Sequence, residues 1–579
     1  MPKPKIKRRT LLKAGLGTAA SSMLLTPFSS LSAKRPGIMA LHGKETDSAV
    51  YYEITIKREP LLMGMDVGYP ITLNGQFPGP LIRLKEGKDA IIKVNNQLDE
   101  STSIHWHGII IPYQMDGVPG VVFPGIDPGE TFTYHFPVKQ SGTYWYHSHT
   151  GLQEQLGHYG PLICDPMEPE PYHYHREHVV VLSDWTFEEP EAVLMHLKKW
   201  EGYYNYQKRT IFDLVNGISR KGFLNTLKTR AMWARMRMNP RDIADITGAT
   251  YTYLINGFGP DENHALLFRP GERVRLRIIN ASASTYFDFR IPGLKMTVVQ
   301  ADGQNVKPVE VDEFRIAVAE TYDVIVKPEE RRPYALFAEA MDRSGFGLAS
   351  LTFARNIPAK APRRRPPLER GMEAMVMDMK MDGQMDKMNM GQGKDLCGQC
   401  SPKRHRSYPF GPDAAMVVNR PKCMVDNPGT GLSGATRRVL CYADLKALEP
   451  YPQASSSPDK TLEIHLTGNM ERFIWKMWAW DGKRWSSRFE DLLDFPLGKR
   501  VRIIFVNHTM MDHPIHLHGM WMRVQNGCEP FLPRKHTVNI KPAEKLCVEV
   551  DADAFGNWAF HCHILYHMHT GMFRVVRAC

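Results

Sequence analysis

Alternation of polar and apolar residues with a period of two recurs at three widely spaced places in the chain. Each place has a turn with a glycine, then alternating basic and apolar residues that end in asparagine: EGKDAIIKVNN at 86–96, PGERVRLRIIN at 270–280 and LGKRVRIIFVN at 497–507. This alternation, with many β-branched residues, predicts a half-buried strand after each turn. Because one unit recurs at wide spacing, the sequence predicts three copies of one β-domain.

We place these domains at 48–168, 172–358 and 406–579 and expect an all-β fold, in which each domain is a sandwich of short strands. Residues 195–245, inside the middle domain, have the charge and periodicity of helices, and we interpret their Met and Trp residues as packing. Residues 359–405 form a linker before the third domain.

The two outer copies carry histidine pairs at positions where the middle copy has none. IHWHG follows the first repeated strand and HPIHLHG follows the third, whereas ASASTYFDF follows the second; GTYWYHSH near 145 also matches GNWAFHCH near 560. On a strand, His-X-His sends both imidazoles to one face. The pairs are His105 and His107, His147 and His149, His516 and His518, and His561 and His563. The sequence therefore predicts a metal site built by both outer domains, for copper, zinc or iron.

Cys562 narrows the choice of metal. It lies between His561 and His563 but points to the opposite face of the strand. Three further side chains complete a His₂Cys set with a weak thioether, the ligand set of blue copper: His513, His567 and Met572. Zinc would favour more thiolates or an open three-ligand site, and it is not redox-active. One strand would thus join a one-electron copper on one face to a copper cluster on the other by a short covalent path.

These motifs resemble the four copper-binding motifs of the multicopper oxidase family. The resemblance covers both outer domains and implies three cupredoxin domains, four copper ions and reduction of O₂ to water with four electrons. It implies a type 1 copper at His513, Cys562, His567 and Met572, a type 2 copper at His105 and His516, and two type 3 coppers, one at His107, His147 and His563 and the other at His149, His518 and His561.

Reduction of O₂ also requires protons, which acids near the cluster supply in related enzymes. Asp116, eleven residues after His105, matches one such acid by its offset, although an aspartate before glycine is also common in turns. A second acid often follows the His-Cys-His motif in bacterial members. Here Met568 and His569 occupy that stretch, so the second proton route is left open.

A methionine tract lies between the second and third domains. Eight methionines are interleaved with Asp, Lys, Gln and Asn: Met372, Met375, Met377, Met379, Met381, Met385, Met388 and Met390. So many polar groups argue against a buried segment, and thioethers select Cu(I). Together with the N-terminal leader, HSHTGLQEQLGHYGP and LTGNMERFIWKMW, the tract resembles the copper-resistance protein A group. The resemblance implies oxidation of Cu(I) to Cu(II), with Met511 as a substrate-side ligand and Met470 and Met477 as weaker candidates.

Two other functions remain open at this point. A laccase-like phenol oxidase would use the same coppers on a small organic reductant, and a copper-sequestering protein would keep the oxidase site without turnover. A two-domain nitrite reductase is disfavoured because one chain carries all the histidine pairs of a three-copper cluster.

The N-terminus predicts export. Residues 1–33 have a basic start with Arg8-Arg9, a mildly apolar stretch and a small-residue end, which resembles a twin-arginine signal read by the twin-arginine translocase. We therefore expect a periplasmic protein. The formal charge is +11 over the chain, and without the six basic leader residues it is about +5, too mild to indicate nucleic acid. No apolar run is long enough for a membrane span.

Overall fold

The three predicted strands are the same structural element in three domains. In this computed structural model, which describes residues 35–200, 202–235, 238–370, 402, 405, 407–434, 436–452 and 457–579, they are β7 (Asp89–Asn96), β15 (Val274–Asn280) and β27 (Arg500–Asn507). Each pairs parallel with the first long strand of its domain and antiparallel with a later one. The predicted leader and the eight tract methionines lie outside the described residues.

The elements of the first domain form two sheets, ordered β1-β2-β7-β9 with β5 beside β2, and β6-β11-β10-β8, and β3 and β4 pair with each other. Their remaining bounds are β1 (Lys44–Glu45), β2 (Ala49–Arg58), β3 (Leu61–Met63), β4 (Asp66–Gly68), β5 (Ile71–Leu73), β6 (Ile82–Lys85), β8 (His105–His107), the 3₁₀ turn η1 (Tyr113–Met115), β9 (Thr131–Pro137), β10 (Gly142–His147) and β11 (Tyr159–Asp165).

The middle domain also has two sheets, ordered β13-β12-β15-β20-β17-β18 and β14-β22-β21-β16-β19. Its other elements are β12 (Arg176–Trp185), α1 (Pro190–Lys199), α2 (Ile211–Lys221), α3 (Phe223–Arg235), β13 (Thr252–Ile255), β14 (His264–Leu267), β16 (Phe287–Arg290), β17 (Met296–Ala301), β18 (Gln304–Val311), β19 (Glu313–Ile316), β20 (Thr321–Val326), β21 (Tyr334–Ala340) and β22 (Phe346–Thr352). Helices α2 and α3 lie in the segment 195–245 that the sequence predicts to be helical, whereas α1 begins five residues before it.

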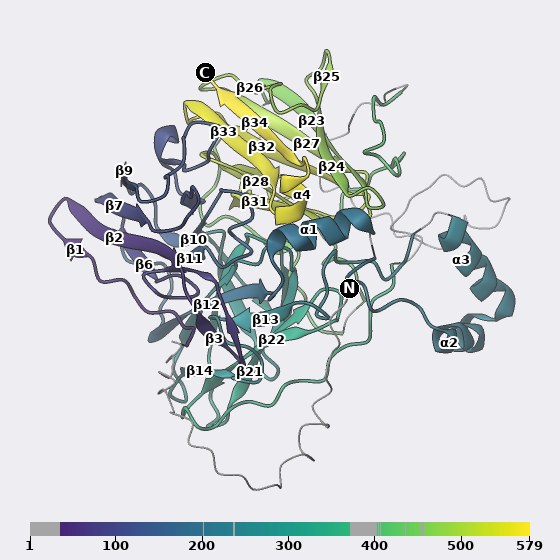
Figure 1. Cartoon of the computed structure of the whole chain (residues 1–579), viewed down its shortest axis with the longest axis horizontal. Coiled ribbons are helices and arrows are strands. Elements are labelled where there is room, and N and C mark those ends of the chain that lie inside the picture. Colours follow the sequence, from purple (N-terminus) through teal and green to yellow (C-terminus); the bar gives the residue numbers. More distant parts are fainter. Residues whose placement is uncertain are drawn as a thin grey trace, which may run out of the picture.

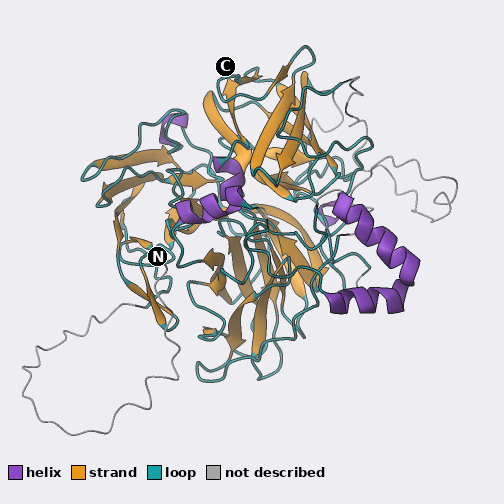
Figure 2. Ribbon diagram, turned by 45° about the vertical axis from the view of Figure 1, so that its right-hand side comes forward, coloured by secondary structure: helices purple, strands orange, loops and turns teal. Residues whose placement is uncertain are grey.

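The third domain repeats the arrangement, with sheets ordered β25-β24-β23-β27-β32-β29-β30 and β26-β34-β33-β28-β31. Its other elements are η3 (Tyr442–Asp444), β23 (Lys460–Asn469), β24 (Ile474–Trp480), β25 (Trp485–Ser486), β26 (Leu493–Phe495), β28 (His513–Leu517), β29 (Met522–Val524), β30 (Arg534–Lys535), β31 (Thr537–Ile540), β32 (Lys545–Asp551), β33 (Gly556–Cys562), α4 (Leu565–His569) and β34 (Phe573–Ala578). The all-β, three-domain prediction is confirmed, and strands are the main elements of the described residues (Figures 1 and 2).

The asparagine that ends each repeated strand has the same structural role in all three domains. Asn96, Asn280 and Asn507 are buried. Each donates its side-chain amide to two carbonyls across the following loop and accepts a backbone N–H from the residue two positions on. A buried amide satisfied in this way fixes the loop. One acceptor of Asn507 is the carbonyl of Met511, two residues before His513, so the corner positions the histidine motif.

Buried polar contacts fix the outer domains against the middle one. Arg277 donates to the Thr143 hydroxyl (2.9 Å), which in turn donates to Asp323 (2.9 Å). From the third domain, Lys535 pairs with Asp302 (2.9 Å) and the backbone N–H of Thr537 donates to the same carboxylate (3.1 Å). Breaking one partner of such buried pairs is strongly destabilising. The middle domain therefore holds the two histidine-bearing domains in a fixed relation.

Candidate metal centres

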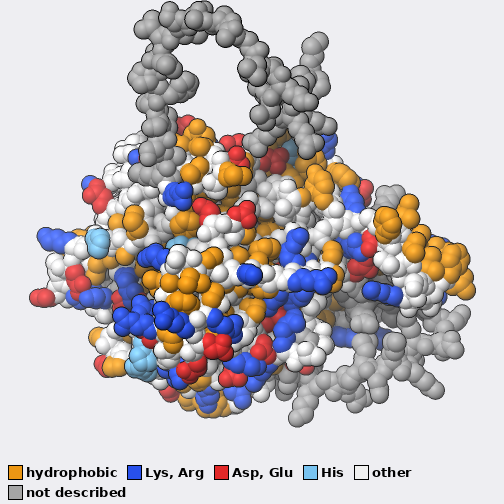
Figure 3. Space-filling model, turned by 90° about the horizontal axis from the view of Figure 1, so that it is seen from below, with side chains coloured by type: hydrophobic (Ala, Val, Ile, Leu, Met, Phe, Trp, Pro, Cys, Tyr) orange, Lys and Arg blue, Asp and Glu red, His pale blue; other side chains and the backbone are white. Residues whose placement is uncertain are grey.

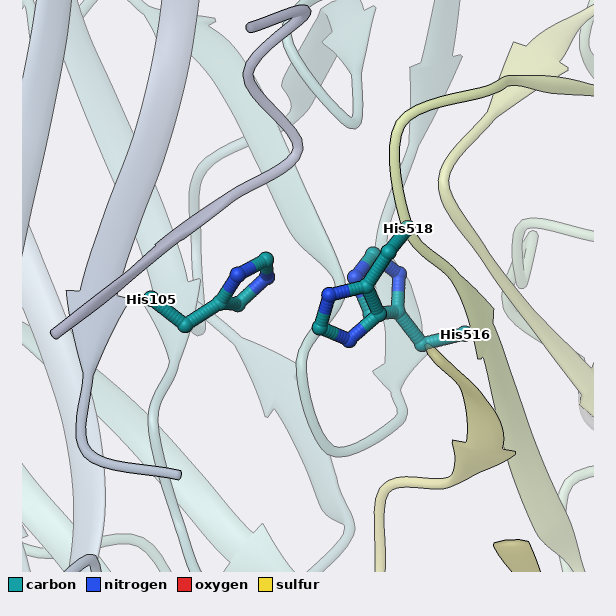
Figure 4. Close-up of side chains that lie close together, drawn as sticks. All are labelled: His105, His516 and His518. Atoms are coloured by element: carbon teal, nitrogen blue, oxygen red, sulfur yellow. The ribbon is translucent and has the colours of Figure 1, made fainter. Parts of the chain in front are cut away.

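The four His-X-His motifs lie on facing strands of the first and third domains. In the first domain β8 pairs with β10, so that His105 stands opposite His147. In the third domain β28 pairs with β33, which sets His516 opposite His561 and Ile515 opposite Cys562. Alternation along these strands sends the histidines of each pair to one face. Figure 4 shows the result for three of them, with His105 facing His516 and His518 across the space between the domains.

Ring nitrogens from the two domains come together in overlapping sets. Within each set the ligand atoms lie within 4.8 Å of one another, and the sets include His105 with His516 and His518, His107 with His147 and His563, and His149 with His518 and His561. All eight are buried or nearly so. Burial lowers the pKa of the imidazoles of His107, His147, His149, His516, His518 and His563, and lowers that of His561 to about 4. Neutral imidazoles are the form that binds metal.

Several of the outer ring nitrogens are hydrogen-bonded, and most of the inner ones are open. Nδ1 of His516 donates to the carbonyl of His536 (2.6 Å), and Nδ1 of His561 donates to the carbonyl of Cys562 (3.0 Å). This fixes the tautomers with a lone pair on Nε2. Among the described residues, six of the eight histidines have a buried Nε2 without a hydrogen-bond partner: His105, His107, His147, His149, His516 and His563. Orphaned, converging imidazole nitrogens without thiolates fit a cluster of copper ions.

Two buried carboxylates face the outer edge of this cluster. Asp116 follows η1 and lies with Oδ2 2.8 Å from Nδ1 of His518 and Oδ1 3.3 Å from Nδ1 of His105, so it connects both domains. Glu154, which our sequence analysis missed, places Oε2 2.9 Å from Nδ1 of His147 and Oε1 3.9 Å from Nδ1 of His563. Burial, then the charge of Asp184, raises the pKa of Glu154. Glu154 lies within HSHTGLQEQLGHYGP, and an acid five residues after a histidine pair was the available signal.

A ninth histidine lies beside the cluster, and the sequence motifs did not reveal it. His536 is buried, its Nε2 has no hydrogen-bond partner among the described residues, and its ring nitrogens group with those of His107 and His516. Gly108 makes room for it, because a Cβ at this position would lie 2.5 Å from Cδ2 of His536. His536 stands in KHTVNI, outside any His-X-His pair.

The cysteine site forms on the other face of β33. Sγ of Cys562 lies 3.7 Å from Nδ1 of His513 and 3.9 Å from Nδ1 of His567, and these two nitrogens are 3.3 Å apart. One ion with bonds of about 2.0 Å to nitrogen and 2.3 Å to sulfur in a trigonal plane would separate S from N by roughly 3.7 Å. Cys562 is buried and forms no disulfide, so its sulfur is available as a metal ligand. Burial raises the pKa of its thiol in the absence of a cation.

Backbone bonds bring Met572 back to this site. Its carbonyl accepts the N–H of Cys562 (3.0 Å), and its own N–H donates to the carbonyl of His567 (3.0 Å). The side chain is fully buried. The structure thus brings together all four residues that the sequence assigns to the one-electron site.

Both histidines of the cysteine site have outer partners. Nε2 of His513 donates to the hydroxyl of Thr509 (2.7 Å), and Nε2 of His567 donates to the carboxylate of Asp245 (2.7 Å), which comes from the middle domain. The indole of Trp475 stacks on the His567 ring with centroids 3.8 Å apart. Such partners fix ring orientation and tautomer.

A cavity of about 220 Å³ opens directly against these partners. Trp475 and Thr509 form part of its wall, and four methionines from four separate segments form another part: Met238, Met416, Met470 and Met510. Asp242 and Glu471 add carboxylates. Met238 lies in the predicted helical segment, after α3, so one methionine of this segment lines a cavity, whereas Trp233 packs in a small apolar cluster with Met416 and Met510.

The two other methionine candidates lie elsewhere. Met511 lines a second, much smaller cavity together with Asp245, Met341, Asp342 and Asp512. Met477 is fully buried in the core. Met470, the third candidate, faces the larger cavity.

Comparisons with known proteins agree with this geometry. Models of the multicopper oxidase family match residues 58–169, 176–354 and 455–578. The chain is 46% identical to copper resistance protein A of Escherichia coli over 99% of both chains, and 46% identical to the copper resistance protein A homolog of Pseudomonas syringae pv. tomato over 98% of both. Among solved structures, Fet3p, described as a multicopper oxidase that functions in iron import, has a TM-score of 0.61 at 19% identity and covers 92% of this chain and 90% of its own.

Proposed function

Because the chain belongs to the multicopper oxidase family, and so is a copper-dependent oxidoreductase that uses O₂ as acceptor, we propose that its substrate is Cu(I), oxidised to Cu(II) for copper resistance. The relatives named for copper resistance support this substrate. The single observation that carries the proposal is the methionine-lined cavity beside the cysteine site.

The proposal includes four coppers with the ligands derived from the sequence. The type 1 set is His513, Cys562, His567 and Met572, the type 2 set is His105 and His516, and the type 3 sets are His107, His147 and His563, and His149, His518 and His561. When bound, copper at these sites supplies one-electron acceptance at the cysteine and four-electron reduction of O₂ to water at the histidine cluster.

The protein's own residues connect and protect these sites. Cys562 is bonded through the backbone to His561 and His563, so a copper held by its thiolate would be one residue away from the histidine cluster on either side. Asp116 orients His105 through its backbone carbonyl and His518 through its carboxylate, and delivering protons is the role that we propose for it from its offset. Glu154 orients His147 and supplies a second carboxylate beside the cluster, whereas the stretch after His-Cys-His contains no acid.

The methionine cavity suits Cu(I) in its chemistry and in its location. Thioethers are soft ligands that select Cu(I), and carboxylates compensate the positive charge. Two wall residues contact the two type 1 histidines directly: Trp475 stacks on His567, and Thr509 accepts from His513. Only one side chain, that of Trp475 or Thr509, would thus separate an ion held among these thioethers from a type 1 histidine.

The test replaces the four cavity methionines by leucine, which conserves volume and removes sulfur. We expect kcat/KM for Cu(I), measured as O₂ uptake, to fall at least tenfold, while oxidation of an organic reductant stays within twofold. Met511→Leu and the exposed Met167→Leu serve as controls. An unchanged Cu(I) rate in the fourfold variant would place the substrate elsewhere; a loss confined to Met511→Leu would favour the smaller cavity.

Two further outcomes would favour the alternative functions. Rapid organic turnover without added copper, unaffected by deletion of residues 372–390, would favour a laccase-like phenol oxidase. Copper tolerance that survives Cys562→Ser but is lost with the tract would favour sequestration, since the thiolate is then dispensable.

The proposed location is the periplasm. The twin-arginine-like leader at 1–33 supports it, and it lies outside the described residues. In the described part of the chain, no helix is both long and apolar enough to cross a bilayer. We propose the domain bounds 48–168, 172–358 and 406–579 for expression of single domains.

A further inference from the structure

Helices α2 and α3 form a hairpin that projects from the side of the molecule (Figures 1 and 2). Thr210 caps α2 in a capping box with Asp213, and Gly222 turns the chain with a φ of 80°. Thr226 of α3 lies against Gly217 of α2, and the buried Trp233 anchors the far end of α3. The two helices are therefore held against each other and against the body of the protein.

The outer surface of this hairpin carries large apolar side chains at one spacing on both helices. The positions are i, i+1 and i+4: Ile211, Phe212 and Val215 on α2, and Phe223, Leu224 and Leu227 on α3. Phe212 is 81% exposed, Leu224 79% and Ile211 78%. Soluble monomers rarely leave so many neighbouring aromatic and aliphatic groups in water. No described residue covers them, and Figure 3 shows hydrophobic side chains gathered at this end of the molecule.

The charge of the same segment is almost entirely basic. Between residues 208 and 235 the basic residues are Lys208, Arg209, Arg220, Lys221, Lys228, Arg230 and Arg235, and the only acid is Asp213. That acid pairs with Arg241 from outside the hairpin (2.8 Å). The apolar side chains are thus bordered by basic residues at both ends, beside Ile211 and beside Phe223.

We propose that the α2–α3 hairpin docks the protein on the surface of an anionic phospholipid bilayer. Amphipathic helices with Phe and Leu on one face and Lys and Arg around it insert the apolar face at the headgroup level. Each basic residue near an anionic surface adds attraction. The complementary charge selects lipid phosphates over neutral surfaces.

The docking is peripheral and independent of the oxidase chemistry. None of the six apolar residues belongs to the copper sets or to the methionine cavity. Docking would nevertheless hold the cavity near the bilayer, because Met238 and Asp242 follow α3 in the chain.

The test uses the copper-loaded chain from residue 34 onward and sedimentation with large unilamellar vesicles of phosphatidylethanolamine and phosphatidylglycerol in a 7:3 ratio. We expect binding at least tenfold tighter than to phosphatidylcholine vesicles, and weaker binding at high salt. Phe212→Ser combined with Leu224→Ser should lower binding at least tenfold and leave the blue absorption and O₂ uptake unchanged. The matched control removes two exposed apolar groups elsewhere, Met65→Ser and Phe555→Ser, and should bind like wild type.

Three results would overturn the proposal. The wild type could fail to sediment with anionic vesicles, or the Phe212 and Leu224 variant could bind as tightly as the control. Light scattering could instead show a dimer that this variant converts to a monomer, with no vesicle binding, in which case a second copy of the chain covers the hairpin.

Discussion

Asp245 offers the sharpest test of how the middle domain controls the cysteine site. Its Oδ2 accepts the Nε2–H of His567 at 2.7 Å, while Nδ1 of the same ring faces Sγ of Cys562 at 3.9 Å. Asp245→Asn keeps an oxygen that can accept this proton and removes the negative charge. The substitution therefore separates electrostatics from ring orientation.

The size of the effect follows from the geometry. Across the imidazole, the carboxylate lies roughly 6 to 7 Å from an ion bonded to Nδ1. One unit charge at that distance contributes about 2.5 kcal/mol at an effective dielectric constant of 20, and about 1 kcal/mol with stronger screening. Because a negative charge stabilises Cu(II) more than Cu(I), its removal should raise the reduction potential, by about 40 to 110 mV at 59 mV per tenfold change.

The assay is a redox titration of the copper-loaded protein that follows its blue absorption. Asp342→Asn is the matched control, since Asp342 lines the same small cavity but hydrogen-bonds Ser344, and burial raises its pKa. We expect a much smaller shift there. An unchanged or lower potential in Asp245→Asn, or an equal rise in the control, would refute the electrostatic reasoning.

Three further predictions concern the histidine cluster. Copper-free protein should lose stability as the pH falls from 6.5 toward 4, because a histidine of the unfolded chain takes up a proton near pH 6.5 while buried His561 does so only near 4. Each such histidine lowers the free energy of unfolding by up to about 1.4 kcal/mol per pH unit. Equal denaturation midpoints at pH 7.5 and 5.5 would contradict this. Gly117→Ala should lower the melting temperature far more than Gly120→Ala. Both glycines have a positive φ, but only a Cβ at Gly117 would clash with another atom, the carbonyl oxygen of Ile104 at 1.9 Å. Equal losses in the two variants would exclude the clash. Glu154→Gln should weaken copper retention by His147 about 10- to 100-fold, measured as copper content after dialysis against a chelator, whereas full retention would show that Glu154 does not support this site.

The repeated sandwich could be predicted because its signal is local. Period-two alternation and a turn glycine mark β7, β15 and β27, and the same buried asparagine ends all three. The histidine pairs were equally visible, since a strand sends i and i+2 to one face whatever surrounds it. The stretch after β15 has no such pair, and the eight paired histidines that come together lie in the first and third domains.

Other parts of the site have little or no local signal. Glu154 follows a histidine pair by five residues but matches no motif, and His536 stands alone in the sequence and meets His107 and His516 only in the folded chain. The methionine cavity shows the same limit. The sequence drew attention to the tract, to Met511 and, more weakly, to Met470, while the four cavity methionines lie up to 272 positions apart along the chain, from Met238 to Met510.

The sequence by itself determined the type of donor, the strand that carries it and the side to which it points, because these depend on residue chemistry and on the two-residue period of a strand. Only the tertiary structure decided which groups surround those donors. Asp245 reaches His567 from the middle domain, Asp116 reaches His518 from the first, and four thioethers meet at one cavity. These contacts depend on how whole sheets pack, and side chains brought together by packing leave no periodic trace in the chain.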